Sequence, residues 1–324
     1  MDYLFFVIGL GLLLLGANYL VDSSVAIAQR ARISNFIIGL TVVGMGTSAP
    51  ELFISVSSAI TGHGDVAIGN VVGSNICNIF LILGVTATIY PFAIRHEVSR
   101  RDIPLGIFAA VLLFALCNDS FIPGISENTL SRIDASLLLL IFIGYMCWVI
   151  VSKGKNPQQA IADADEQTRS VFTGLHPALL WTVAVVSLAA LVGGGQLFLD
   201  ATQNIARAWG VSEAVISITI VALGTSLPEL ITAVIAACKH NPELALGNVI
   251  GSNVFNILMI LGIAGIVSPI TIQAVNIVDF MVMIGASLAT FAIVKTLKKD
   301  FFDRAEGIIF LLAYIAYNIY LFLR

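Results

Sequence analysis

Charged residues are scarce in this sequence. Only 11% of its 324 residues are Asp, Glu, Lys or Arg, whereas 58% are hydrophobic, and the mean hydropathy is +0.97. Because soluble domains have about 25% charged residues, this composition excludes a water-soluble globular protein and predicts a polytopic membrane protein. Charge-free runs longer than the ~18 residues of a spanning helix include 3–21, 66–94, 170–199 and 244–278.

Cysteine is also scarce, and its spacing suits neither a redox pair nor a metal site. The four cysteines lie in or at the ends of apolar segments without a CxxC pair, so we interpret them as packing residues. The first apolar run lacks the basic stretch and small-residue cleavage site of a signal peptide, which predicts a retained span. We expect neither a resident cofactor nor a nucleic-acid partner.

The apolar runs between polar breaks predict an all-α membrane protein with ten transmembrane helices. Their approximate bounds are 3–28, 33–60, 65–90, 103–118, 134–151, 173–206, 212–238, 243–267, 275–295 and 304–323. The one long polar stretch, Ser152–Ser170, is too short for a folded domain. We therefore expect two five-helix halves, residues 1–151 and 173–324, joined by a linker at 152–172.

The positions of Lys and Arg predict the orientation of the chain. With the N-terminus outside, thirteen of the 16 basic residues fall in the linker and the loops after spans 1, 3, 7 and 9. Only Arg132, Arg207 and Arg324 fall on the other side. Because cytoplasmic loops are enriched in Lys and Arg, we expect a cytoplasmic linker and both termini outside.

A stretch of about forty-five residues occurs twice, at 39–84 and 217–262. The copies align without a gap at an offset of 178 residues (217 minus 39), with 22 of 46 positions identical. They occupy spans 2–3 and 7–8, five spans apart, and an odd separation makes them enter the membrane from opposite faces. This is an inverted-topology repeat, for which a ligand site near the membrane midplane is expected.

Each copy places a glutamate, Glu51 or Glu229, within an apolar run. An ionised carboxylate at the centre of a spanning helix costs at least ~2.5 to 3.5 kcal/mol, so it needs a compensating partner. Neither helical core contains a Lys, Arg or His, and a bound cation is the simplest partner. The alternative, a protonated carboxyl hydrogen-bonded between helices, is the weaker explanation for two glutamates with identical neighbours.

Residues with oxygen donors surround each glutamate. The hydroxyls one turn earlier fall on the glutamate's side of a helix; they are Thr47 and Ser48 in the first repeat, and Thr225 and Ser226 in the second. Pro50 and Pro228 are predicted to open the helix over 44–47 and 222–225, which would free carbonyl oxygens for a cation.

The following helix adds a stripe of amides and hydroxyls with a spacing of four. The stripes are Asn70, Ser74 and Asn78, and Asn248, Ser252 and Asn256. Two GxxxG pairs beside them, Gly69 with Gly73 and Gly247 with Gly251, predict close helix packing. All-oxygen donors suit hard cations such as Ca²⁺ or Na⁺ and argue against zinc or copper.

The segments GTSAPE and GTSLPE, followed by GNVVGSNICN and GNVIGSNVFN, resemble the α-1 and α-2 repeats of the sodium/calcium exchanger family, within the cation/Ca²⁺ exchanger superfamily. The resemblance covers both repeats and the ten-span layout. It implies a cation site with Glu51 and Glu229 at its centre. The other implied ligands are Thr47, Ser48, Thr225, Ser226, Ser74, Asn78, Ser252 and Asn256, with the carbonyls of Gly44 and Ala222 nearby.

One residue departs from the family pattern. Sodium-driven members often have an Asp where this chain has Asn256, which matches Asn78 in the first repeat. Two carboxylates balance one Ca²⁺ or two protons, whereas three Na⁺ would leave a surplus charge in a site of low dielectric constant. The driving ion therefore stays open, with Na⁺ favoured by the resemblance.

The resulting hypothesis is a secondary antiporter that exchanges Ca²⁺ for Na⁺ by alternating access, and not an enzyme. We expect it to work as a monomer in the lipid bilayer of a prokaryotic plasma membrane. The first alternative is a Ca²⁺/H⁺ exchanger. An intramembrane hydrolase using Ser48 or Ser226 would need a base that the repeats do not offer, and a channel would conduct without counter-transport.

Overall fold

The computed structural model describes residues 1–119, 128–152, 170–172, 174–210, 222–272, 277–297 and 300–323. Among these residues, seven helices are long and apolar enough to cross a membrane, and the bent pair Asn35–Thr47 with Ala49–Ile60 makes an eighth. Residues 153–169 of the linker predicted at 152–172 lie outside the described residues. The expected all-helical membrane architecture is confirmed.

The helices follow the predicted order. The spans outside the repeats are α1 (Asp2–Ala31), α7 (Ile103–Leu116) after a π-helical turn (Val98–Asp102), α8 (Arg132–Ser152), α10 (Pro177–Ala208), α16 (Ile277–Ala292) before a π-helical turn (Ile293–Leu297), and α17 (Arg304–Leu323). The first repeat forms α2 (Asn35–Ile38), a π-helical turn (Gly39–Val43), α3 (Gly44–Thr47), α4 (Ala49–Ile60), α5 (Gly64–Ile76), a π-helical segment (Cys77–Leu83) and α6 (Gly84–Ile89). The second forms α12 (Ala222–Gly224), α13 (Leu227–Cys238), α14 (Pro242–Val254), a π-helical segment (Phe255–Ile260) and α15 (Leu261–Val267).

The helices of the two repeats form the centre of the bundle. In the spanning window of Pro242–Val267, 83% of the residues are buried, and in that of Gly64–Ile89 67% are, against 17% for Arg304–Leu323. The outer helices instead expose large apolar side chains such as Ile309 and Leu312, which suits a surface that faces lipid. The polar residues of the repeats are thereby shielded from the surroundings of the bundle.

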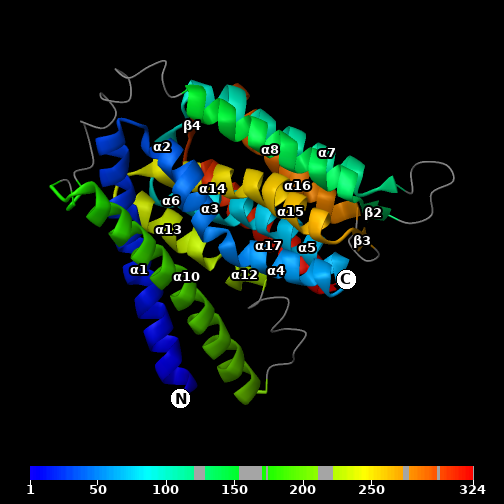
Figure 1. Cartoon of the computed structure of the whole chain (residues 1–324), viewed down its shortest axis with the longest axis horizontal. Helices are drawn as coiled ribbons and strands as arrows, with labels where there is room; N and C mark the ends of the chain where they lie inside the picture. Colours follow the sequence, from blue (N-terminus) through cyan, green and yellow to red (C-terminus); the bar gives the residue numbers. More distant parts are fainter. Residues whose placement is uncertain are drawn as a thin grey trace.

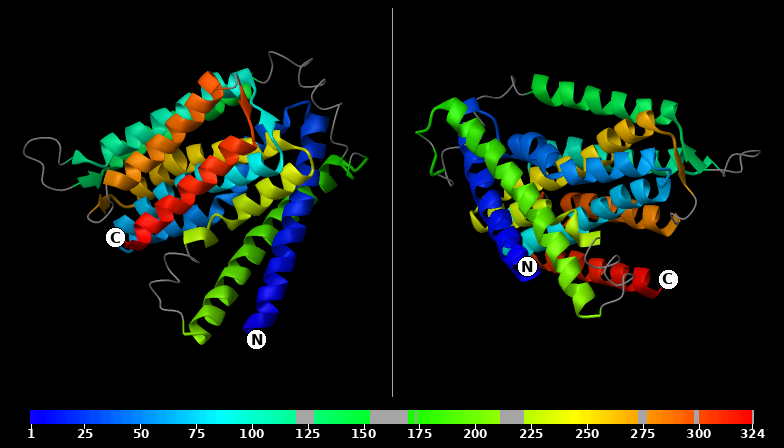
Figure 2. Two further views of the ribbon diagram at one scale, coloured as in Figure 1. Left: turned by 180° about the vertical axis from the view of Figure 1, so that it is seen from behind. Right: turned by 60° about the horizontal axis from the view of Figure 1, so that its bottom comes forward.

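Helices α1 and α10 form a pair that stands apart from the other helices. They pack against each other and project beyond the rest of the bundle at one end (Figures 1 and 2). Glycine makes this close approach possible, since a Cβ atom at Gly9 would overlap the backbone of Phe198 and one at Gly16 that of Leu191. The pair is thus a compact unit beside the central helices.

Glycines also bring the two repeats together. A Cβ atom at Gly247 would overlap the carbonyl oxygen of Phe36, and one at Gly251 that of Leu40. The close packing predicted for this GxxxG pair is therefore confirmed, with the second span as the partner. For the first pair, Gly69 and Gly73, the offset of 178 points to residues 214–218, which lie outside the described residues.

Two short antiparallel ladders join the halves at their ends. Strand β1 (Phe92–Ala93) pairs with β4 (Phe301–Phe302), and β2 (Asn128–Leu130) pairs with β3 (Ile270–Ile272). Residues 92–93 and 270–271 are again 178 apart, so the segment after each repeat pairs with a segment of the other half. Pairing across the halves fixes their relative position by backbone hydrogen bonds.

Candidate cation site

Each glutamate-bearing span is broken immediately before its glutamate. The helix axes of Asn35–Thr47 and Ala49–Ile60 differ by 45°, and Ser48 between them has non-helical backbone angles (φ −81°, ψ 10°). Pro50 and Pro228 lie in the first turn of the new helices α4 and α13, where a missing N–H costs little. The span that carries Glu229 breaks in the same way.

The breaks are shorter than predicted, and of the expected positions 44–47 and 222–225 only Thr225 lies in one. Residues 44–47 and 222–224 are helical, and the turn is confined to Ser48 in the first repeat and to Thr225–Ser226 in the second. The carbonyl oxygen of Gly44 accepts a hydrogen bond from the backbone N–H of Ser48 at 3.2 Å. Proline therefore starts a new helix at once instead of unwinding the previous turn. Ala222 begins α12, and its carbonyl, like that of Gly44, belongs to a helical turn.

Both glutamates are buried at the start of a helix. Glu51 and Glu229 are each 1% exposed and lie in the first turns of α4 and α13. Their carboxylates are close enough to interact electrostatically. The positive end of each helix dipole favours a negative charge there. Within the described part of the chain, no Lys, Arg or His forms an ion pair with either glutamate.

The hydroxyls of each repeat contact the glutamate of the other repeat. Ser48 Oγ donates to Glu229 Oε1 at 3.0 Å, and Thr47 lies beside the same carboxylate. Glu51 in turn lies beside Thr225 of the second repeat, and also beside Ser74 of its own repeat. On an unbroken helix, these threonines and serines would face the glutamate of their own repeat. The break redirects them, and the two copies of the motif form one site.

A symmetric pair of asparagines holds the glutamate-bearing helices in place. Asn70 Nδ2 donates to the backbone carbonyl of Glu51, and Asn248 Nδ2 to that of Glu229, both at 3.3 Å. Asn248 Oδ1 also accepts from Thr47 Oγ1 at 3.1 Å. The sequence placed both asparagines on the polar stripe, but only the fold shows that they contact the backbone of the glutamates.

Six buried oxygen atoms of the predicted ligands have no hydrogen-bond partner among the described residues. They are Glu51 Oε2, Glu229 Oε2, Asn78 Oδ1, Asn256 Oδ1, Ser226 Oγ and Ser252 Oγ. Buried polar atoms without a partner are rare in native proteins, because each one costs about 1–3 kcal/mol. Ca²⁺ and Na⁺ bind to oxygen ligands, such as those of carboxylates, amides and hydroxyls. The donor set therefore fits a hard cation.

Comparisons with known proteins point to the same chemistry. A family model described as "Sodium/calcium exchanger protein" matches residues 1–151 and 179–323. The chain is 36% identical over 322 residues to the putative antiporter CaxA of Alkalimonas amylolytica, with 98% of both chains covered. It is 32% identical over 347 residues to the sodium/calcium exchanger MaX1 of Methanosarcina acetivorans, covering 99% of this chain and 98% of the relative. A solved structure of the sodium-calcium exchanger NCX_Mj, soaked with 2.5 mM Na⁺ and 10 mM Sr²⁺, has a TM-score of 0.80 at 31% identity and covers 98% of both chains.

These matches extend over both halves of the chain and include a fold match along nearly its whole length. The fold is therefore that of ten transmembrane helices in two inverted repeats. The family is one of transporters and not of enzymes, which excludes the intramembrane hydrolase with Ser48 or Ser226 as nucleophile. The chain belongs to the sodium/calcium exchanger family.

Proposed function

We propose that this protein exchanges Ca²⁺ for Na⁺ across a prokaryotic plasma membrane, with both ions competing for one site between Glu51 and Glu229. Among the described residues, buried oxygens without a hydrogen-bond partner surround two carboxylates that form no ion pair with a cationic side chain, and this observation supports the proposal most strongly. Its ligands are the residues predicted from the repeats. The names of the relatives MaX1 and NCX_Mj favour Na⁺ as the counter-ion.

Transport follows from alternating access to this site. An empty site with two negative charges is costly to enclose at low dielectric constant, so bound cations license the passage between the outward-open and inward-open states. We assign the sliding element to the α1–α10 pair, because it packs as a unit beside the central helices (Figure 2). The five-helix halves, the cytoplasmic linker at 152–172, the external termini and function as a monomer belong to the same proposal.

A Ca²⁺/H⁺ exchanger is the second candidate, and Asn256 is the observation that favours it. With an amide at this position the site has two carboxylates, which one Ca²⁺ or two protons neutralise. Three Na⁺ would leave a surplus positive charge.

The driving ion can be tested in proteoliposomes loaded with Ca²⁺. We expect an inward Na⁺ gradient to drive Ca²⁺ efflux and a pH gradient of equal size to have a much smaller effect. The control is the same liposome without protein, and ionophores hold the membrane potential constant. Efflux that follows the pH gradient and ignores Na⁺ would replace our proposal by the second candidate. Flux without any counter-ion gradient would indicate a channel.

One ion pair holds α1 against the glutamate-bearing helix α13 on the side that we assign to the cytoplasm. Lys239 Nζ lies 2.6 Å from Asp22 Oδ1 and donates to the carbonyl oxygen of Asn18 at 3.0 Å. At the repeat offset of 178 residues, Asp200 corresponds to Asp22 and Thr61 corresponds to Lys239. Asp200 accepts a bond from Gln196 of its own helix, and Thr61 donates to Ser57 O of its own helix. The pair is therefore one-sided and stabilises closure on the cytoplasmic side.

Replacing Asp22 by Asn is expected to ease opening towards the cytoplasm. A partly buried ion pair contributes on the order of 1 kcal/mol, so the apparent KM for cytoplasmic Ca²⁺ should fall about fivefold. Uptake into inside-out vesicles measures this KM. Asp200→Asn is the matched control and should leave it unchanged. The double variant Asp22→Lys with Lys239→Asp should restore the wild-type value, and an unaltered KM in Asp22→Asn would contradict the role of this pair.

A further inference from the structure

A hydrogen bond between the two halves fixes the orientation of one predicted ligand. Asn78 Nδ2 donates to Asn253 Oδ1 at 3.0 Å, which joins the π-helical segment Cys77–Leu83 to α14. The Asn78 side chain is buried, and its Oδ1 has no hydrogen-bond partner among the described residues. The amide nitrogen of Asn78 is thus hydrogen-bonded, whereas its amide oxygen is available to a ligand.

A side-chain amide presents a donor at one end and an acceptor at the other. Only the oxygen end binds a cation, and rotation of the amide by 180° would turn two N–H donors towards the positive charge. We infer that Asn253 is a positioning residue, which holds the Asn78 amide with its oxygen towards the transported cation. This inference rests on the proposed function, because it deepens the description of the same site.

Among the described residues, no equivalent contact holds Asn256, the counterpart of Asn78 in the second half. The counterpart of Asn253 is Asn75 (253 minus 178), whose Nδ2 donates to the backbone carbonyl of Val71 in its own helix at 2.8 Å. Asn75 Oδ1 and Asn256 Oδ1 have no partners among the described residues, so neither accepts a bond from the other amide. Asn78 is therefore held in one orientation from outside the site, and Asn256 is not held in this way by Asn75.

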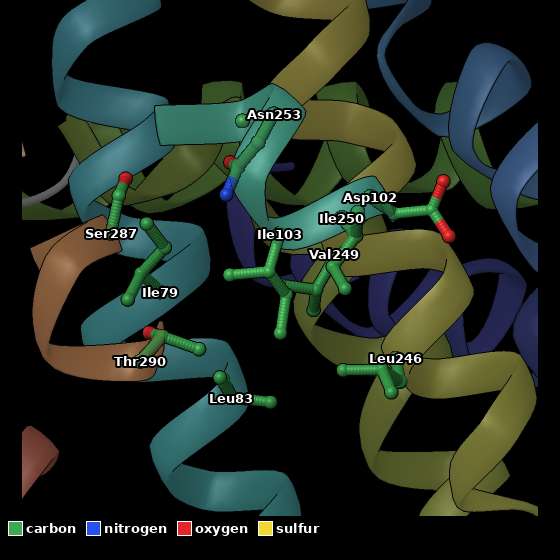
Figure 3. A pocket seen from close by; sticks show the side chains of 11 residues that line it. Ile79, Leu83, Asp102, Ile103, Leu246, Val249, Ile250, Asn253, Ser287 and Thr290 are labelled. Atoms are coloured by element: carbon green, nitrogen blue, oxygen red, sulfur yellow. The ribbon is translucent and has the colours of Figure 1, made fainter. Parts of the chain in front are cut away.

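Asn253 also borders a small cavity. The cavity has a volume of about 40 Å³ and is lined mostly by aliphatic side chains, together with Asp102 and with Ser287 and Thr290 of α16. Figure 3 shows the Asn253 side chain at the edge of this cavity, among residues from several helices. Both hydroxyls donate to backbone carbonyls within α16, at 3.0 Å each. A side chain of similar size at position 253 therefore has space beside it.

Three variants separate positioning from packing. Asn253→Leu removes the acceptor for Asn78 but keeps the branching and the number of heavy atoms of the side chain, Asn253→Asp keeps an acceptor, and Asn75→Leu is the matched control in the other half. We expect Asn253→Leu to raise the KM for Ca²⁺ about tenfold with the maximal rate changed less than twofold. Asn253→Asp should stay within about threefold of wild type, and Asn75→Leu should be unchanged. Asn253→Ala, which demands less space, is measured alongside in case the leucine variant does not fold.

The coupling of the two asparagines provides the decisive comparison. In an Asn78→Ala background, Asn253→Leu should add nothing further to the KM, because the oriented group is already absent. Additive effects, or equal effects of Asn253→Leu and Asn75→Leu, would overturn the inference. A loss in Asn253→Asp as large as in Asn253→Leu would do so as well, since it would make Asn253 the donor. Wild-type Ca²⁺ flux in the same vesicles tests the proposed function separately.

Discussion

Glu51→Gln and Glu229→Gln are each expected to reduce Ca²⁺ transport to the background of protein-free liposomes. Each change removes one of two negative charges at the site but keeps the size and hydrogen-bonding capacity of the side chain. At ~4 Å and an effective dielectric constant of about 20, one pair of unit charges is worth about 4 kcal/mol. A divalent ion loses at least that much, which corresponds to roughly a thousandfold or more in affinity.

Both variants should fold. In the described part of the chain the glutamates form no ion pair, so a neutral amide leaves no buried cationic side chain without its counter-charge. Ca²⁺ uptake into proteoliposomes and ⁴⁵Ca²⁺ binding to the purified protein measure the effect, and size-exclusion chromatography checks the fold. Glu97→Gln, at an exposed position before α7, is the control and should behave as wild type. Uptake retained in both glutamate variants would refute the assignment of the site.

The second large effect is expected for Asn256→Asp, which adds a third carboxylate to the site. A unit negative charge ~5 Å from a bound ion is worth about 3 kcal/mol at an effective dielectric constant of about 20. The third charge balances a third Na⁺, so the Na⁺ concentration for half-maximal Ca²⁺ efflux should fall at least tenfold. The dependence of the rate on Na⁺ concentration should also become steeper.

Efflux at a series of Na⁺ concentrations measures both quantities. Asn204→Asp adds the same charge at an exposed position of α10 and should change neither. If Asn256→Asp leaves the Na⁺ dependence as it is in the wild type, the number of carboxylates does not set the coupling. The argument that links Asn256 to the choice of driving ion would then be wrong.

Much of the architecture could be predicted because it depends on local properties of the chain. The length of apolar runs indicates spans, and the separation of the repeats by an odd number of spans indicates inversion. The structure confirms the resulting all-helical arrangement, with π-helical segments that begin at equivalent positions, Cys77 and Phe255.

The predictions from helix periodicity were wrong at the point where the helix breaks. A proline was expected to unwind residues 44–47, but the helix continues to Thr47 and turns at Ser48. Periodicity describes an unbroken helix, so it assigned Ser48 to the side of Glu51. After the turn, Ser48 instead donates to Glu229. One residue with non-helical angles was enough to exchange the partners of the two repeats.

The sequence by itself determined the kind of protein this is: a membrane-spanning chain of two inverted repeats, with two glutamates and a set of neutral oxygen donors. These features follow from residue type and spacing. The tertiary structure alone decided which donor contacts which carboxylate, that Asn248 links Thr47 to the backbone of Glu229, and that Asn253 holds Asn78. Such contacts join residues of different halves, and their geometry exists only once the two halves have docked.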